Sequence, residues 1–453
     1  MPCAGDGIAL HWAVNGGHIE ELKALLEARA DVSATDALQQ TALHLAAEVG
    51  NNDAIKLLVD ARANVLATDF RGRTAMHIAA SNSESLQILL DSLKDVSAST
   101  ENGRRPLHLA AEFGSTGTID RLLRAFADVH AKDSDGRTAL HWAGKGRRAE
   151  ALTMLLEASA YVNLQDNKLD TAIHLVMKCE CRIMPCSCRH DRLRCVQILL
   201  QFGADVNVQD IEASTLLHIA AKIGDAEALK HFLESNADVQ LIDKGGNCVL
   251  HTAVEYQHRE VLDVLLDGRA PAQFNIDTHN NDGETPLAIA AKNGDDHMMA
   301  RLLDAGADIT TQNGGGLTIL ELAIYSGRTQ AVERSLIPGG GFETVGIERA
   351  SEMAILACPG AIELIFSYYR KINPEEEYRD TPLHVAARHG SISAAWQLLN
   401  KGHWTDLDVR DYGGRKPEDR AREAGNSDMT AVLYTVRRKG LNIAANPYNR
   451  KAN

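Results

Sequence analysis

The residues of this chain best suited to acid–base or metal chemistry are nine histidines that recur at a nearly fixed interval. Imidazole groups exchange protons near neutral pH and bind metal ions. Most successive copies are 33 residues apart. One copy per interval places the histidines in successive layers of a repeating structure, so they do not converge on one metal ion or substrate. They are His11, His44, His77, His108, His141, His174, His218, His251 and His384.

A cluster of cysteines is the second candidate for metal chemistry. Zinc prefers four thiolate or imidazole ligands in a tetrahedron, and structural sites usually use C-x2-C pairs. The pairs here are C-x-C, which strain a single tetrahedron in so short a segment, and the last cysteine suits packing on a predicted helix. We expect no bound metal; the alternatives are a redox-reactive or surface loop, with Arg182, Arg189, Arg192 and Arg194 lowering thiol pKa values. The metal candidates are Cys179, Cys181, Cys186, Cys188, His190 and Cys195.

Other catalytic patterns are missing from the sequence. It contains no phosphate-binding glycine-lysine-serine/threonine loop, no G-x-G-x-x-G after a predicted strand and no G-x-S-x-G elbow. The glycine-rich segments 313–316 and 338–341 lack the flanking strand and lysine, and they predict turns. We therefore expect no catalytic residues and no cofactor. The same patterns would also be missing here if a catalytic domain had been lost by truncation.

The segment 135–143, with the sequence DGRTALHWA, is the element that positions the histidines. Gly136 permits the positive φ of a tight turn, and the Thr138 hydroxyl can cap a helix. Leu140 and Ala143 begin an apolar stripe. The segment predicts a turn, a cap and a short helix.

Close copies of this segment occur along nearly the whole chain, each followed by a second predicted helix. The steps between successive histidines from His11 to His251 are 33, 33, 31, 33, 33, 44 and 33 residues. The copies of its Thr-Ala-Leu-His core are TALH at 41–44, TAMH at 74–77, RPLH at 105–108, TAIH at 171–174, TLLH at 215–218 and TPLH at 381–384. Each unit resembles the ankyrin repeat, whose features are a threonine-proline-leucine-histidine helix start, a second helix and a β-hairpin finger.

The resemblance implies an all-α fold, an α-solenoid of about 13 stacked ankyrin repeats with short β-hairpin fingers. It gives the nine histidines a structural task, hydrogen bonding between adjacent repeats. Trp12 and Trp142 follow the motif histidines where leucine is usual, so we expect both to pack in the core. It implies no enzyme activity.

Composition agrees with a repeat array. Aromatic residues make up 5% of the chain and hydrophobic residues 45%, which fits thin layers of Ala, Leu, Ile and Val. A net charge of −14 argues against general affinity for nucleic acids or anionic membranes. No segment has the roughly 20 apolar residues that cross a bilayer, and the start does not resemble a signal peptide. With sparse cysteines, this predicts a cytoplasmic location, with the nucleus as the alternative.

The steps also predict the organisation along the chain. Repeats one to ten occupy 6–337, with an 11-residue Cys-rich insertion within 179–192 between the two helices of repeat six. One proline and three glycines at 338–341, in a shortened finger, predict a hinge at 338–342. Degenerate and capping repeats follow at 343–440, and 441–453 predict a disordered tail.

Two functions agree with these features. The first is a non-catalytic scaffold or adaptor, because ankyrin arrays bind partner proteins through their fingers and inner helices. The second is the regulatory or targeting region of a larger enzyme or channel, and its support is that repeat one begins abruptly at Ile8.

A candidate partner-binding site lies in repeats three to five. We call the residue before the capping position of each repeat the pre-cap residue; it reads Gln40, Arg73, Arg104, Arg137, Asp170, Ser214, Asn247 and Glu284. Three consecutive repeats thus present arginine, which suits carboxylates, in an acidic chain. We expect an extended acidic segment of a protein to bind there. The predicted binding residues are Phe70, Arg71, Arg73, Arg104, Phe113, Arg137, Lys145 and Lys168.

Overall fold

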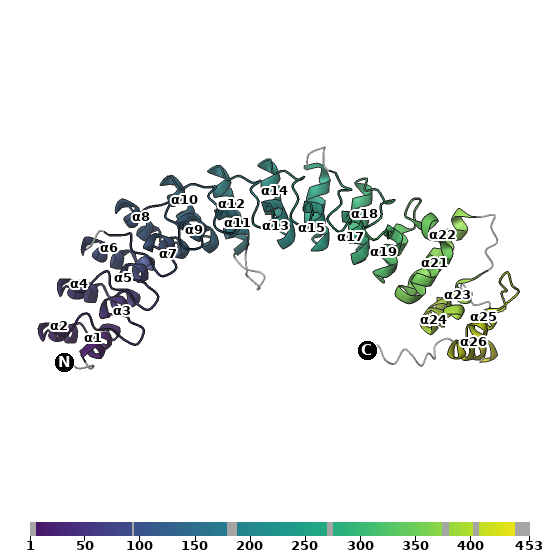
Figure 1. The fold of residues 1–453 in the computed structure, drawn as a ribbon, viewed down its shortest axis with the longest axis horizontal. Coiled ribbons are helices and arrows are strands. Elements are labelled where there is room, and N and C mark those ends of the chain that lie inside the picture. Colours follow the sequence, from purple (N-terminus) through teal and green to yellow (C-terminus); the bar gives the residue numbers. More distant parts are fainter. Residues whose placement is uncertain are drawn as a thin grey trace. The chain divides into compact units, whose positions relative to one another are not determined.

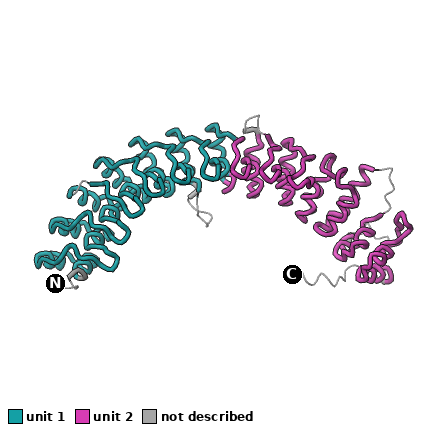
Figure 2. Tube along the Cα trace, viewed as in Figure 1, with its two compact units in different colours: residues 1–220, 225–238 teal, residues 221–224, 239–453 magenta. Residues whose placement is uncertain are grey.

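The structure is a computed structural model of the chain. It describes residues 6–92, 95–178, 188–269, 275–373, 380–401 and 407–439. The chain divides into two compact units (Figure 2): unit 1 comprises 1–220 and 225–238, and unit 2 comprises 221–224 and 239–453.

Unit 1 is built from pairs of short helices, and each pair corresponds to one repeat (Figure 1). The first helices are α1 (Asp6–Asn15), α3 (Ala42–Val49), α5 (Ala75–Ile78, extended by η1, Ala79–Ser81), α7 (Pro106–Phe113), α9 (Ala139–Gly146), α11 (Ala172–Met177) and α13 (Leu216–Ile223). The second helices are α2 (Ile19–Glu27), α4 (Asn52–Asp60), α6 (Ser83–Ser92), α8 (Thr116–Arg124), α10 (Ala149–Glu157), α12 (Cys188–Gln201) and α14 (Ala226–Glu234).

Unit 2 continues the same alternation. Its first helices are α15 (Val249–Glu255), α17 (Pro286–Asn293), α19 (Ile319–Tyr325), α21 (Phe342–Ala357), α23 (Pro382–His389) and α25 (Pro417–Glu423). Its second helices are α16 (Arg259–Val264, followed by η2, Leu265–Arg269), α18 (Asp296–Asp304), α20 (Thr329–Ser335), α22 (Ile362–Ile372, preceded by η3, Pro359–Ala361), α24 (Ile392–Lys401) and α26 (Ser427–Lys439).

The core is a series of thin layers between neighbouring helix pairs. In repeat two, Leu43 and Ala46 of α3 and Ile55 and Leu58 of α4 are all at most 1% exposed. Small alanines let the helices approach closely, and each helix buries a single apolar stripe. The predicted all-α repeat stack is confirmed, whereas the exact count of about 13 repeats stays a prediction.

Most fingers are turns held by an aspartate, as the one before α9 illustrates, and Thr100, Asn280 and Asn313 take that place in three others. The Asp133 N–H donates to the Arg137 carbonyl at 2.9 Å, and the Asp133 carboxylate accepts the N–H groups of Asp135 and Arg137 at 3.0 and 2.8 Å. Gly136 has a φ of 78°, as the turn requires. In the next finger, the Asn167 N–H donates to the Asp135 carbonyl at 2.9 Å, so a backbone hydrogen bond joins adjacent fingers.

The motif histidines connect each repeat to the next. In repeat five, the Thr138 N–H donates to His141 Nδ1 at 3.1 Å, and the other ring nitrogen, Nε2, lies 3.1 Å from the Asp170 carbonyl of repeat six. Because Nδ1 accepts a backbone N–H, the ring is the neutral tautomer that donates from Nε2. His174 is an exception: within the described residues its buried Nε2 has no hydrogen-bond partner. The same bridge to a pre-cap carbonyl is made by His11, His44, His77, His108, His251 and His384.

The glycines of the predicted hinge lie close to repeat ten. A Cβ on Gly340 would be 2.0 Å from the Ser335 carbonyl oxygen, and one on Gly341 would be 2.5 Å from Thr318 Cβ. The Leu320 N–H donates to the Gly340 carbonyl at 3.3 Å. The glycines therefore make close contacts with repeat ten, and the hinge at 338–342, expected from the shortened finger, stays a prediction.

We expect the segment before Leu336 to unfold separately from the segment after Gly341, because coupling in a repeat array is only between neighbours. Two variants would each retain one probe, Trp142 or Trp396, with the other tryptophans changed to Phe. Urea unfolding followed by fluorescence should then give two different midpoints. Coincident transitions at both probes would disprove the hinge.

Candidate partner-binding groove

The eight predicted binding residues lie in the fingers and first helices of repeats three to six of unit 1. We call the surface of these fingers and first helices the groove face. Phe70, Arg71, Arg73, Arg104, Arg137 and Lys168 lie in fingers, whereas Phe113 ends α7 and Lys145 lies in the last turn of α9. The structure therefore places the predicted residues on corresponding parts of successive repeats.

The three pre-cap arginines already bind carboxylates of the chain. Arg73 lies 2.7 Å from Asp69, and Arg104 pairs with Glu112. Arg137 lies 3.0 Å from Asp166 of the next finger and 3.1 Å from Asp135. Their side chains are 32%, 20% and 12% exposed, respectively. From the sequence alone, the arginine run predicts exposed guanidinium groups whose reversal to Glu leaves stability almost unchanged. The structure differs for Arg73 and Arg137, because their partners Asp69 and Asp166 have fully buried side chains.

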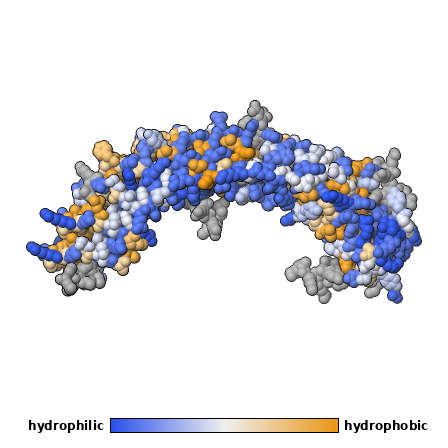
Figure 3. Space-filling view, in the orientation of Figure 1, coloured by the Kyte–Doolittle hydropathy of each residue, from blue (hydrophilic) through white to orange (hydrophobic). Residues whose placement is uncertain are grey.

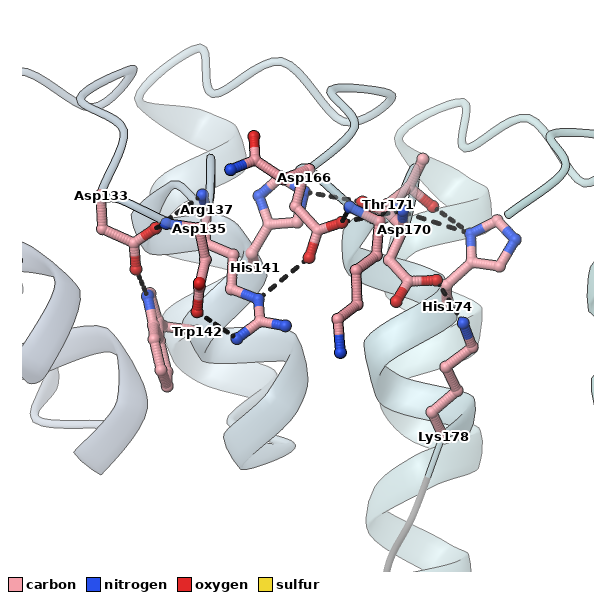
Figure 4. A network of polar contacts seen from close by, with 12 residues as sticks. Asp133, Asp135, Arg137, His141, Trp142, Asp166, Asp170, Thr171, His174 and Lys178 are labelled. Atoms are coloured by element: carbon pink, nitrogen blue, oxygen red, sulfur yellow. Dashed lines mark hydrogen bonds and ion pairs between the residues drawn. The ribbon is translucent and has the colours of Figure 1, made fainter. Parts of the chain in front are cut away.

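The Trp142 ring lies under three cations of the groove face. Its ring centroid is 3.8 Å from Arg104 Cζ, 4.7 Å from Lys145 Nζ and 5.5 Å from Arg137 Cζ. The indole N–H donates to the Asp133 carboxylate at 2.8 Å (Figure 4). Cations gain energy over an indole face. Trp142 is therefore buried, at 7% exposed, as predicted, but it packs beneath charged groups of the groove face.

Trp12 differs from its predicted core position. It is 62% exposed and stacks on His18 with ring centroids 4.5 Å apart. Trp142 is covered by Arg104, which belongs to the preceding repeat, and no described residue has that place beside Trp12. The prediction of a buried Trp12 is thus wrong, because burial at this position depends on the neighbouring repeat.

The remaining predicted residues are exposed. Phe70 is 42% exposed and Phe113 52%. The Arg71 guanidinium lies 5.0 Å from the Phe70 ring centroid. Within the described residues, no carboxylate pairs with Arg71, Lys145 or Lys168. These three cations are the ones available to a partner.

Sequence reasoning missed an ion-pair network at the end of α11. Lys178 Nζ lies 2.5 Å from Asp170 (Figure 4) and 2.9 Å from Asp210. Burial opposes the charge on Lys178, but its two carboxylate partners raise its pKa above the usual value. Burial raises the pKa of Asp170, which is 2% exposed. Opposite charges eight residues apart in one repeat are the signal that would have predicted the pair.

The structure bears on part of the cysteine cluster. Cys179, Cys181 and Cys186 lie outside the described residues, as does the side chain of Cys188 at the start of α12. Cys195 is 0% exposed, and burial raises its pKa to about 12, so it favours the protonated thiol, which is a poor ligand. This placement agrees with packing for Cys195. Within the described ranges, no group of three or more potential ligands is arranged for a metal ion.

We expect purified protein to contain only substoichiometric zinc. Elemental analysis of the protein prepared without chelators measures this directly. One equivalent of zinc that disappears on changing Cys186 and Cys188 to Ser, with the helical circular dichroism retained, would contradict the expectation.

On the side shown in Figure 3, hydrophilic and hydrophobic residues are interspersed over unit 1. Among the described residues, no helix is both long and apolar enough to cross a membrane.

Comparison with known proteins identifies the repeats. The pattern described as ankyrin repeats (3 copies) matches residues 10–100, 86–166 and 183–276, and that described as ankyrin repeats (many copies) matches 272–323. The single ankyrin repeat pattern matches 378–412.

Among curated proteins, the chain is similar to the "Target of rapamycin complex 2 subunit AVO2" of Saccharomyces cerevisiae. The two are 46% identical over 69 residues, which are 15% of this chain and 16% of the yeast protein. The match thus spans less than a fifth of that relative. The family patterns cover more than half of the chain, and with the helix pairs and histidine bridges they show that the chain belongs to the ankyrin repeat family.

Proposed function

We propose that this chain is a non-catalytic scaffold or adaptor that binds a partner protein along the groove face. Ankyrin repeats are protein-interaction modules, and fold alone does not name the partner. The observation that supports this site is the set of exposed cations and aromatic rings in the fingers and first helices of repeats three to six. The yeast relative is named as a subunit of a complex, which is compatible with this role.

The proposed partner segment is extended and acidic, with aromatic or aliphatic anchors. Its carboxylates bind the groove face near Arg71, Lys145 and Lys168, and its apolar anchors contact Phe70 and Phe113. The pre-cap arginines Arg73, Arg104 and Arg137 add positive potential, although their own carboxylates reduce it. We also propose a cytoplasmic or nuclear location, on the basis of the sparse cysteines.

Affinity capture with the full chain, followed by mass spectrometry, tests the proposal. A groove variant would carry Arg71→Glu, Lys145→Glu and Lys168→Glu, which break no ion pair within the described residues. A matched control would carry Lys23→Glu, Lys56→Glu and Arg124→Glu on second helices, with the same change in net charge.

We expect a partner that the wild type and the control retain and the groove variant loses. Retention of the same proteins by all three would place binding elsewhere and contradict the proposal.

A further inference from the structure

Opposite charges face each other at one recurring place on the first helices. In four repeats the pre-cap residue and the residue eight positions later, at the end of the first helix, form an ion pair. In repeat six, Asp170 and Lys178 are 2.5 Å apart, and in repeat nine Glu284 and Lys292 are 2.8 Å apart. The other two examples are Arg104 with Glu112, and Arg415 with Glu423 at 3.0 Å. These four repeats pair charges of either order. In repeat twelve, the opposite charges at the two positions pair elsewhere, Arg388 with Glu352 and Asp380 with Arg420.

Repeat five has two cations at this place. Arg137 is its pre-cap residue, and Lys145 follows eight positions later. Arg137 turns instead to Asp135 and to Asp166 of the next finger, at 3.1 and 3.0 Å. Lys145 is exposed and has no carboxylate partner within the described residues. In this repeat the chain supplies the cations but not the carboxylate that would face Lys145.

The surroundings of Lys145 suit a bound carboxylate. Its ammonium group lies 4.7 Å from the centroid of the buried Trp142 ring. The ring is itself fixed by the 2.8 Å hydrogen bond from its indole N–H to Asp133 and by Arg104 on its face. A cation held over a fixed ring loses less side-chain freedom on binding than one on an open surface.

We infer that Lys145 is the docking point for one aspartate or glutamate side chain of the partner. This carboxylate completes in repeat five the charge pair that Glu112 completes in repeat four. The inference rests on the proposed function and narrows it from a basic region to one recognised group. A phosphate is the alternative anion, and the comparison with phosphoserine below distinguishes it.

The variant Lys145→Glu tests this directly, because it gives repeat five its own carboxylate eight residues after Arg137. This variant should unfold at the same or a higher temperature than the wild type, and it should no longer bind the partner's carboxylate. Lys145→Met retains an unbranched apolar side chain but lacks the charge. It therefore distinguishes the contribution of side-chain packing to peptide binding from that of the positive charge. The matched control is Lys222→Glu, at the same position of repeat seven: Lys222 is exposed and lies 5.3 Å from the Tyr256 ring centroid, but serine is its pre-cap residue.

The probe is a displayed library of random dodecapeptides selected on the wild-type full chain. We expect selected peptides to share an acidic residue, and its change to the corresponding amide should weaken binding roughly tenfold. The same peptides should bind Lys145→Glu and Lys145→Met roughly tenfold more weakly and Lys222→Glu normally.

Equal binding to Lys145→Glu, or tighter binding when phosphoserine replaces the acidic residue, would overturn the inference. Cross-linking separates the two proposals. Selected peptides that cross-link to the groove face but lack the acidic residue overturn only this inference. Peptides that cross-link only to second helices also overturn the proposed function.

Discussion

The variant Arg137→Glu is expected to lower the free energy of unfolding by about 3 kcal/mol, the typical cost of breaking a buried ion pair. Asp166 has a fully buried side chain, 3.0 Å from the Arg137 guanidinium. It cannot turn away, because its carboxylate also accepts the N–H groups of Lys168 and Asp170 at 2.8 and 3.0 Å. The reversal thus places three carboxylates together, with Asp135 as the third.

Arg124→Glu is the matched control. Arg124 pairs with Asp120 at 3.0 Å, but the two side chains are 79% and 45% exposed. Exposed pairs typically contribute at most about 1 kcal/mol, so this reversal should change stability little. Urea unfolding followed by circular dichroism measures both variants. If Arg137→Glu destabilises no more than Arg124→Glu does, the Asp166 pair is not part of the folded structure as described.

Acidification from pH 7 toward pH 4 is the second large expected effect. Burial lowers the pKa of seven motif histidines below the ordinary 6.5, to about 4 for His77 and for His174. The same direction holds for His44, His108, His141, His251 and His384. Protonation puts a hydrogen on Nδ1. This nitrogen then cannot accept the hydrogen bond from the backbone N–H, and two N–H donors face each other.

The sign of the effect follows from proton binding. Between pH 6.5 and about 4, the unfolded chain binds more protons than the folded one, so stability is complete above pH 6.5 and is lost as the pH falls. Each such histidine contributes up to about 1.4 kcal/mol per pH unit within that range. Buried carboxylates with a lowered pKa affect stability only at a lower pH than the histidines do. Burial raises the pKa of Asp69, but hydrogen bonds from Arg73 and Arg71 outweigh it and hold this pKa below 3.8.

Thermal unfolding at several pH values between 7.5 and 4.5 measures the loss. We expect the midpoint to fall steeply below pH 6.5, and the variant His77→Gln to have a less stable fold with a shallower pH dependence. An unchanged midpoint down to pH 4.5, or an unchanged slope in His77→Gln, would contradict the neutral-histidine bridges.

The histidine spacing predicted most of the fold, because each repeat makes the same contacts with its neighbours. One period therefore determines the turn, the first helix and the bridge from His141 to the Asp170 carbonyl. The exceptions arise where a neighbour differs. Trp12 and Trp142 follow the same motif, but only Trp142 has Arg104 of a preceding repeat above it.

The candidate site was predicted by residue type and position but not by pairing. A run of three pre-cap arginines is visible in the sequence, whereas the partner of Arg137 lies in the next finger and that of Arg104 eight residues later. The pair of Arg137 with Asp166 is missed when each repeat is considered alone. A comparison of the pre-cap position with the position eight residues later, made across all repeats, would have revealed the pair of Arg104 with Glu112. The same comparison would have shown that Arg137 and Lys145 are both cations.

Hydrogen–deuterium exchange of the full chain, with and without its captured partner, tests the groove face most directly. The account predicts that the partner slows exchange in the fingers at 69–73, 100–104, 133–137 and 166–170 and in α7 and α9. The second helices α6, α8 and α10 should exchange as in the free chain. Slower exchange confined to those second helices, with unchanged fingers, would contradict the groove face as the binding surface.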